Sequence, residues 1–79
     1  MVTVYAIQSG LKGTVYVGMT MDITRRLAEH NAGKTRSTKA GRPWNLIYSE
    51  NQTDWKSARI REKYLKSGVG KEFLKSLVP

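Results

Sequence analysis

The chain has 79 residues, of which 39% are hydrophobic and 25% are charged, and it has no cysteine. This length allows one domain with one small core, the composition argues against disorder, and the lack of thiols excludes disulfide bonds and thiolate metal sites. No apolar stretch approaches the roughly 20 residues of a membrane span, and the N-terminus lacks the pattern of a signal peptide. We therefore expect a cytoplasmic protein with no membrane partner. No dimerisation seam is evident in the pattern, which favours a monomer.

The charge balance is the strongest global feature. Fourteen Lys and Arg residues against six Asp and Glu residues give a net charge of +8 and a pI near 10.1. Such a field attracts polyanions, and nucleic acid is the first candidate. A solubilising surface or a ribosome-associated protein would have the same balance, so charge alone does not identify the partner.

The first twenty residues predict a β-hairpin. Residues 2–9 and 14–18 are rich in β-branched and aromatic side chains, and the glycine-bounded segment 10–13 between them predicts a tight turn. Tyr5 lies in the first strand and Tyr16 in the second. If the two tyrosines pair directly they share one face of the sheet, whereas a slip of one residue puts them on opposite faces.

The middle of the chain predicts a helix, a loop and a strand. Asp22 has the character of a helix N-cap, and the helix is expected to run to about Asn31 before Gly33. Residues 33–43 have no apolar period, two glycines, one proline and four cations, which predicts a mobile basic loop. Residues 44–49 predict a third strand, whose place in the sheet the pattern leaves open.

Two helices are expected in the last third of the chain. The first starts with a cap at residue 53 or 54 and runs to about residue 66, where Ser67 and Gly68 interrupt it. The second covers residues 71–77, with Phe73, Leu74 and Leu77 facing inward. The predicted fold is therefore α/β (α+β): a small three-stranded antiparallel sheet flanked by helices, in the order β-β-α-β-α with a short C-terminal helix.

Three charged or titratable side chains fall on helix faces that should pack inward. Arg26 and His30 lie one turn apart beside the apolar positions of the first helix. Glu62 lies in the expected inward stripe of the next helix, which holds Trp55, Ala58, Glu62 and Leu65. A carboxylate there must be paired, bound to a metal or protonated. Pairing with Arg26, or with Arg59 and Lys66, is the ordinary explanation, just as packing and hydrogen bonding are for His30 and the tyrosines.

The combination of these residues is more specific than any one of them. Two short triplets, Thr3-Val4-Tyr5 and Tyr16-Val17-Gly18, precede Arg26, and His30 and Glu62 follow it at helical positions. This set resembles the GIY-YIG nuclease superfamily, and most of all its small single-domain bacterial members, over about residues 2–66. The resemblance implies that residues 1–79 form a single nuclease domain of this type.

The sequence departs from the family pattern at two places near the triplets. Thr3 stands where the family has the glycine that gives the first triplet its name. Met19 stands where the excision-repair members carry a lysine, which leaves Lys12 as the nearest alternative cation. The late asparagine or lysine of the family has no counterpart here.

The resemblance implies a metal-dependent DNA endonuclease, and it leaves structure-selective cleavage open. In this implied mechanism Tyr5 is the general base that activates water, and Tyr16 orients the water or exchanges roles with Tyr5. Arg26 stabilises the negative charge on the phosphate, His30 relays a proton or binds phosphate, and Glu62 holds one Mg²⁺ or Mn²⁺. Backbone contacts to DNA are assigned to five cations: Lys12, Lys34, Arg36, Lys39 and Arg42.

Two other functions fit the same residues. A module that binds nucleic acid without cleaving it would keep the fold and the charge, and a protein-interaction domain would use the charge only for solubility. The catalytic hypothesis also makes a geometric demand: the two tyrosines and Glu62 should face the same side of the sheet.

Overall fold

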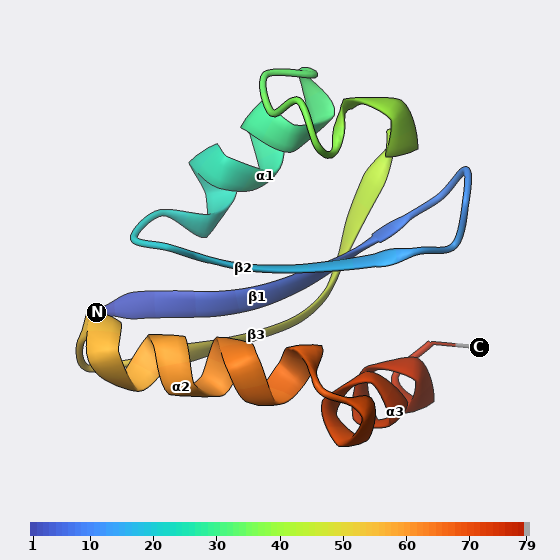
Figure 1. The fold of residues 1–79 in the computed structure, drawn as a ribbon. Helices are drawn as coiled ribbons and strands as arrows, with labels where there is room; N and C mark the ends of the chain where they lie inside the picture. Colours follow the sequence, from blue (N-terminus) through green and yellow to red (C-terminus); the bar gives the residue numbers. More distant parts are fainter. Residues whose placement is uncertain (79) are drawn as a thin grey trace.

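The computed structural model describes residues 1–78, which form one sheet and three α-helices (Figure 1). In chain order the elements are β1 (Val2–Ser9), β2 (Val15–Thr20), α1 (Ile23–Asn31), a 3₁₀ turn η1 (Lys39–Gly41), β3 (Trp44–Gln52), α2 (Trp55–Lys66) and α3 (Gly68–Ser76). The fold is thus the predicted α+β arrangement, with a three-stranded antiparallel sheet and helices around it. No helix within the described residues is long and apolar enough to cross a membrane.

β1 is the central strand of the sheet, and β2 and β3 are its two edges. Both pairings are antiparallel, so the third strand adds on the far side of the hairpin. Tyr5 pairs with Gly18, and Tyr16 pairs with Ile7. The direct pairing of the two tyrosines that we considered is therefore wrong. They are diagonal neighbours two positions apart, and this offset keeps both phenols on the same face because side chains alternate along a strand.

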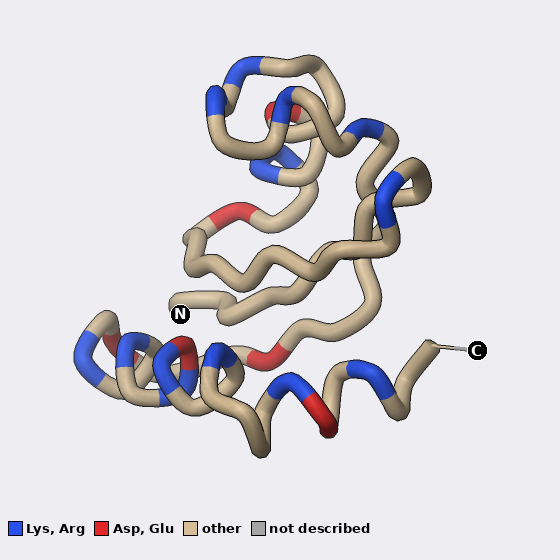
Figure 2. Tube along the Cα trace, turned by 45° about the vertical axis from the view of Figure 1, so that its right-hand side comes forward, with Lys and Arg blue, Asp and Glu red and all other residues tan. Residues whose placement is uncertain are grey.

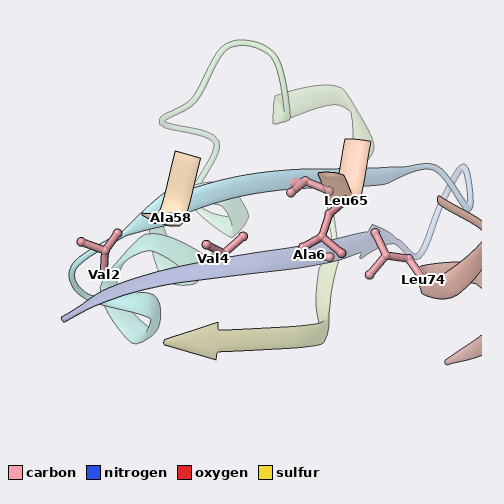
Figure 3. Close-up of a cluster of buried hydrophobic side chains, with 7 residues drawn as sticks. Val2, Val4, Ala6, Ala58, Leu65 and Leu74 are labelled. Carbon is pink, nitrogen blue, oxygen red and sulfur yellow. The ribbon is translucent and has the colours of Figure 1, made fainter. Parts of the chain in front are cut away.

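Helices cover both faces of the sheet. Figure 1 shows α1 over one face and α2 with α3 over the other. Alternate residues of the hairpin face α2 and α3 and pack with residues of these helices. Together they form the larger core cluster, drawn in Figure 3: Val2, Val4, Ala6, Val17, Ala58, Leu65 and Leu74. The hairpin residues between them point to the other face, toward α1. There Tyr5, Ile7 and Trp44 form a second cluster, against which Tyr16, Ile23 and Leu27 pack. The tyrosines therefore belong to the layer between the sheet and α1.

Local signals explain where the helices begin. The Asp22 carboxylate accepts a hydrogen bond from the Arg25 N–H, and Asp54 does the same for Ser57, so both predicted caps are confirmed. Ser67 follows α2 and caps α3, since its hydroxyl accepts from the Gly70 N–H. The last helix consequently starts at Gly68, three residues earlier than expected.

Three large side chains that we expected to face inward are exposed instead. Of the three apolar residues expected to face inward near the C-terminus, only Leu74 is buried, whereas Phe73 is 39% exposed and Leu77 is 43% exposed. Phe73 rests edge-on against Tyr48, with ring centroids 5.3 Å apart. Trp55 is 50% exposed, because the core cluster under α2 begins one turn later at Ala58.

The segment between α1 and β3 is anchored by several hydrogen bonds, which corrects the expectation of a mobile loop. The Ser9 hydroxyl donates to the Gly41 carbonyl at 2.5 Å, and the Trp44 indole N–H donates to the Thr38 carbonyl at 2.7 Å. Asn31, at the end of α1, both donates to and accepts from the Trp44 backbone. These contacts bury Thr38 and hold the basic segment in one place beside α1.

Candidate active site at the edge of β2

Tyr5 lies at the centre of the candidate site and is only 1% exposed. Its ring lies over Gly18 on the neighbouring edge strand. A Cβ atom at position 18 would come within 2.6 Å of the Tyr5 Oη atom and 2.8 Å of its Cζ atom. The glycine of the second triplet is therefore needed for space, because any side chain there would displace the phenol.

His30 continues the site from the last turn of α1 and is fully buried. Its Nε2 atom lies 2.9 Å from the Tyr5 Oη atom, and its Nδ1 atom lies 2.8 Å from the Thr38 Oγ1 atom. The Thr38 hydroxyl in turn donates to the Thr35 carbonyl at 3.4 Å. The three side chains thus form a continuous chain of hydrogen bonds that ends in the backbone.

One arrangement of protons satisfies this chain. Since Thr38 donates to a carbonyl, its oxygen is free to accept from the His30 Nδ1–H. The Arg26 guanidinium, which can only donate, interacts with the Tyr5 hydroxyl oxygen. The Tyr5 hydroxyl then donates its proton to the unprotonated Nε2 atom of His30. In this arrangement the imidazole is a proton acceptor aimed at Tyr5.

The electrostatic environment keeps both partners neutral near pH 7. Burial raises the pKa of Tyr5, the Arg26 guanidinium opposes this shift, and the neighbouring Tyr16 and the Glu62 carboxylate add to it. Burial also lowers the pKa of His30, and the positive charge of Arg26 lowers it further. A neutral phenol therefore faces a neutral imidazole.

Tyr16 lies beside this pair on the same face of the sheet and is half-buried. Its ring centroid is 5.2 Å from that of His30 in an edge-on arrangement and 6.5 Å from that of Tyr5. Trp44 closes the other side at 6.5 Å. Tyr16 therefore lies between the buried relay and the surface.

Arg26 is held in position by Glu29, a residue that we did not predict. The Arg26 Nη1 atom lies 3.2 Å from a Glu29 carboxylate oxygen, and Arg25 approaches the other oxygen at 3.3 Å. The Tyr5 hydroxyl, and after it the Glu29 carboxylate, raise the pKa of Arg26. The i,i+3 spacing of Arg26 and Glu29 was a visible signal for this pair. Thr38 gave no such signal, because its contact depends on how the basic segment folds back.

Glu62 lies on α2, which covers the opposite face of the sheet from the phenols. The expectation that the tyrosines and Glu62 face the same side of the sheet, on which the catalytic role of this set depended, is therefore not met. The carboxylate pairs with Lys66 at 3.2 Å and with Arg59 at 3.6 Å, as in the structural explanation that we considered, and not with Arg26. Glu62 still acts on the phenol, because its charge raises the Tyr5 pKa. Because β2 is an edge strand, the two faces of the sheet meet along its free side.

A second half-buried acid, Glu50, stabilises the fold and lies outside this site. The Glu50 carboxylate accepts two hydrogen bonds from Arg61, at 2.8 and 3.0 Å, and one from the Tyr48 hydroxyl at 2.7 Å. The Arg61 guanidinium is the main reason why the pKa of Glu50 is lowered. This pair joins β3 to α2 and was not predicted from the sequence.

The five cations assigned to DNA contacts are all exposed. Lys34, Arg36, Lys39 and Arg42 lie in the segment that follows α1, and Figure 2 shows several Lys and Arg positions gathered in this segment and in α1. Lys12 lies in the hairpin turn. A hydrogen bond of 2.8 Å from the Gly10 N–H to the Pro43 carbonyl joins that turn to the end of the basic segment.

Comparisons with known proteins point to one family. A family model described as the GIY-YIG catalytic domain matches residues 1–74. The chain is 40% identical over 65 residues to a UPF0213 protein of Desulfotalea psychrophila, a match that covers 80% of this chain and 58% of that protein. It is 35% identical over 66 residues to a UPF0213 protein of Staphylococcus epidermidis, covering 82% and 80% of the two chains. The solution structure of a UPF0213 protein from Bacillus halodurans superposes with a TM-score of 0.57 at 31% identity, covering 98% of this chain and 85% of that one.

Proposed function

Because the chain belongs to the GIY-YIG family, we propose that it is a metal-dependent endonuclease that hydrolyses phosphodiester bonds in DNA. The observation that carries this proposal is the chain of hydrogen bonds from Tyr5 through His30 to Thr38, next to Tyr16 and Arg26. A buried phenol aimed at a neutral imidazole has an obvious chemical use as a proton relay.

In the proposed reaction Tyr5 acts as the general base with the help of His30. A water molecule gives one proton to the Tyr5 oxygen while the Tyr5 proton passes to the His30 Nε2 atom. The resulting hydroxide attacks phosphorus, the phosphodiester P–O bond breaks, and the leaving oxygen takes a proton from solvent. This relay removes the need for a phenolate, whose formation the raised Tyr5 pKa disfavours. Tyr16 orients the water or exchanges roles with Tyr5.

Arg26 is proposed to stabilise the negative charge that builds on the phosphate. Its side chain is 32% exposed, and Glu29 fixes it at one side, so a part of the guanidinium remains available to substrate. Arg25 is a matched control, since it contacts the same Glu29 carboxylate but its side chain is 77% exposed. We expect Arg26→Lys to slow cleavage strongly and Arg25→Lys to leave the rate near that of the wild type, measured under single-turnover conditions.

The donor set fits one Mg²⁺ or Mn²⁺ ion only if substrate and water complete its coordination. No group of three or more His, Asp or Glu side chains gathers among residues 1–78. Glu62 offers a hard carboxylate that would hold the ion, and the remaining ligands of such an ion are commonly water and phosphate oxygens. The ion would supply Lewis-acid stabilisation of the leaving oxygen. Lys66 and Arg59 would have to yield the carboxylate, so metal binding should compete with these ion pairs.

The basic segment is proposed to hold the DNA backbone. Each phosphate contact by Lys34, Arg36, Lys39, Arg42 or Lys12 should add about 0.9 to the slope of log affinity against log salt on duplex DNA. Replacing several of them with Gln should lower this slope and weaken binding irrespective of sequence.

Cleavage of labelled duplex, nicked, branched and single-stranded DNA with Mg²⁺ or Mn²⁺ tests the proposal. The wild type and Glu72→Gln, a control acid that is 78% exposed, should cut, whereas Glu62→Gln should not. Equal rates for the wild type and Glu62→Gln, including no cleavage by either, would remove the support for the metal site.

A non-catalytic nucleic-acid-binding module is the second candidate. The observation that favours it is that both oxygens of the Glu62 carboxylate are engaged by cations, which is sufficient to explain a half-buried acid on α2. Salt-dependent DNA binding without metal-dependent cleavage of any substrate would support this candidate over the nuclease.

A further inference from the structure

A groove of about 660 Å³ lies along the free edge of β2, beside the ends of α2 and α3. Residues 13–17 of the hairpin form one wall, and α2 and α3 contribute Leu65, Lys66, Lys71, Leu74 and Lys75 to the other. Tyr16 is one of the lining residues of this groove, and its ring packs against His30 on the α1 face, so the groove and the candidate active site lie on either side of this one residue.

The lining combines positive charge with apolar surface. Three lysines line it, and no described lining residue is acidic. Lys71 and Lys75 lie one turn apart on α3. Lys66 pairs with Glu62, the residue proposed to hold the metal ion. Val15, which is 36% exposed, and the half-buried Val78 supply apolar surface on which flat groups can rest.

We propose that this groove binds an unpaired DNA strand that leads into or out of the cleavage site. An unpaired strand exposes both phosphates, which lysines attract, and base faces, which stack on aromatic and apolar side chains. A duplex keeps its base faces stacked internally and gains nothing from an apolar floor. An extended peptide could instead pair with the free edge of β2. Lys66 and Lys75 pair with Glu62 and Glu72 beside the groove, but the lining itself holds three lysines and no acid, which favours a polyanion. The inference rests on the proposed nuclease function and specifies its substrate as DNA with an unpaired strand.

Two double variants separate the effect of the groove lysines from the effect of net charge. Lys71→Gln with Lys75→Gln removes two groove lysines, and Lys56→Gln with Lys63→Gln removes two exposed lysines of α2 that do not line it. Both change the charge equally and replace exposed side chains, so circular dichroism and thermal melting should show two folded proteins. The probe is a fluorescein-labelled oligothymidylate in EDTA, so that binding is measured without cleavage.

The expected result is a weaker salt dependence of binding in the groove variant alone. Two lost phosphate contacts lower the log–log salt slope by about 1.4, so between about 50 and about 200 mM salt this variant loses about sevenfold less affinity than the wild type. The control variant should keep the wild-type slope, and backbone amides of residues 13–17 and 71–75 should shift in NMR spectra on titration. Equal slopes for the two variants, or amide shifts absent from these segments, would overturn the proposal. Comparable shifts with polyglutamate would overturn it in favour of an acidic peptide.

Cleavage separates this inference from the nuclease proposal. With Mn²⁺, the groove variant should lose any preference of the wild type for flapped over blunt duplex DNA, and the control variant should retain it. If no variant cleaves any DNA but the groove variant alone loses oligothymidylate binding, the nuclease proposal fails and the binding groove stands. If all variants cleave flapped DNA equally well, the groove proposal fails and the nuclease stands.

Discussion

The Gly18→Ala substitution tests how closely the edge strand and Tyr5 fit together. The new methyl group would meet Tyr5 Oη at 2.6 Å, Tyr5 Cζ at 2.8 Å and Tyr16 Cε1 at 3.2 Å, and the first two distances are too short for any real contact. Gly18 does not have a positive φ, so the backbone itself accepts alanine. The cost therefore arises from displacing the Tyr5 ring, which is buried and has little room to move.

Two contributions set the magnitude. Overpacking a well-filled core typically costs about 1–3 kcal/mol. Moving the ring also lengthens the 2.9 Å hydrogen bond to His30, and a buried polar group that loses its partner costs about 1–3 kcal/mol more. We expect Gly18→Ala to be destabilised by about 2–4 kcal/mol on these two grounds, with the sum reduced because one movement relieves part of both.

Urea unfolding followed by tryptophan fluorescence measures this loss, and Gly68→Ala is the control. A Cβ atom at Gly68 meets nothing within 4 Å, so its midpoint should be unchanged or slightly higher. The ring signals of Tyr5 and His30 should move in NMR spectra of Gly18→Ala but not of Gly68→Ala. A wild-type midpoint and unmoved ring signals for Gly18→Ala would refute the close approach on which this reasoning depends.

Other expectations concern the relay and a helix cap. Thr38→Val should destabilise the protein by about 1–3 kcal/mol in urea, because it leaves the buried His30 Nδ1–H without an acceptor, and Thr38→Ser should restore most of the loss. The folded-state pKa of His30 lies below its unfolded value near 6.5, so the unfolded state binds more protons as the pH drops below about 6.5. The free energy of unfolding should therefore fall over that pH range, and His30→Gln should flatten this dependence. The raised pKa of Tyr5 has the opposite sign: stability should fall as pH rises above about 10, and Tyr5→Phe should remove that part of the loss in alkaline titrations. Asp54→Ala should cost about 1 kcal/mol through the lost α2 cap, measured by the thermal midpoint.

The parts of the fold that local chemistry determines were predictable. The hairpin follows from two β-branched runs around a glycine turn, and α1 and α2 start where Asp22 and Asp54 cap them. Register was not predictable in this way, because it depends on how whole strands pack. The phenols share a face because their offset of two positions is even, whereas an offset of one would have separated them, and a shift between Ala6 and Ile7 alters the pairing with β3.

The candidate site was predictable only where it depends on helical spacing. Arg26 and His30 could be placed on one side of α1, and the Glu29 partner of Arg26 had the spacing of a helical ion pair. Thr38 could not be found, because it reaches His30 only when hydrogen bonds to Trp44 and Ser9 fold the basic segment back. The position of Glu62 on the other face of the sheet also required the three-dimensional layering, which the periodicity of α2 alone does not reveal.

The rate of Mn²⁺-dependent DNA cleavage by Tyr5→Phe, compared with that of the wild type, tests the proposed relay most directly. This substitution removes only the hydroxyl that joins His30 to the proposed water, and the phenyl ring still fills the space over Gly18. The account predicts a fall of about 100-fold or more, as expected for the loss of a general base, with DNA affinity unchanged. A folded Tyr5→Phe protein that cleaves DNA as fast as the wild type would contradict it.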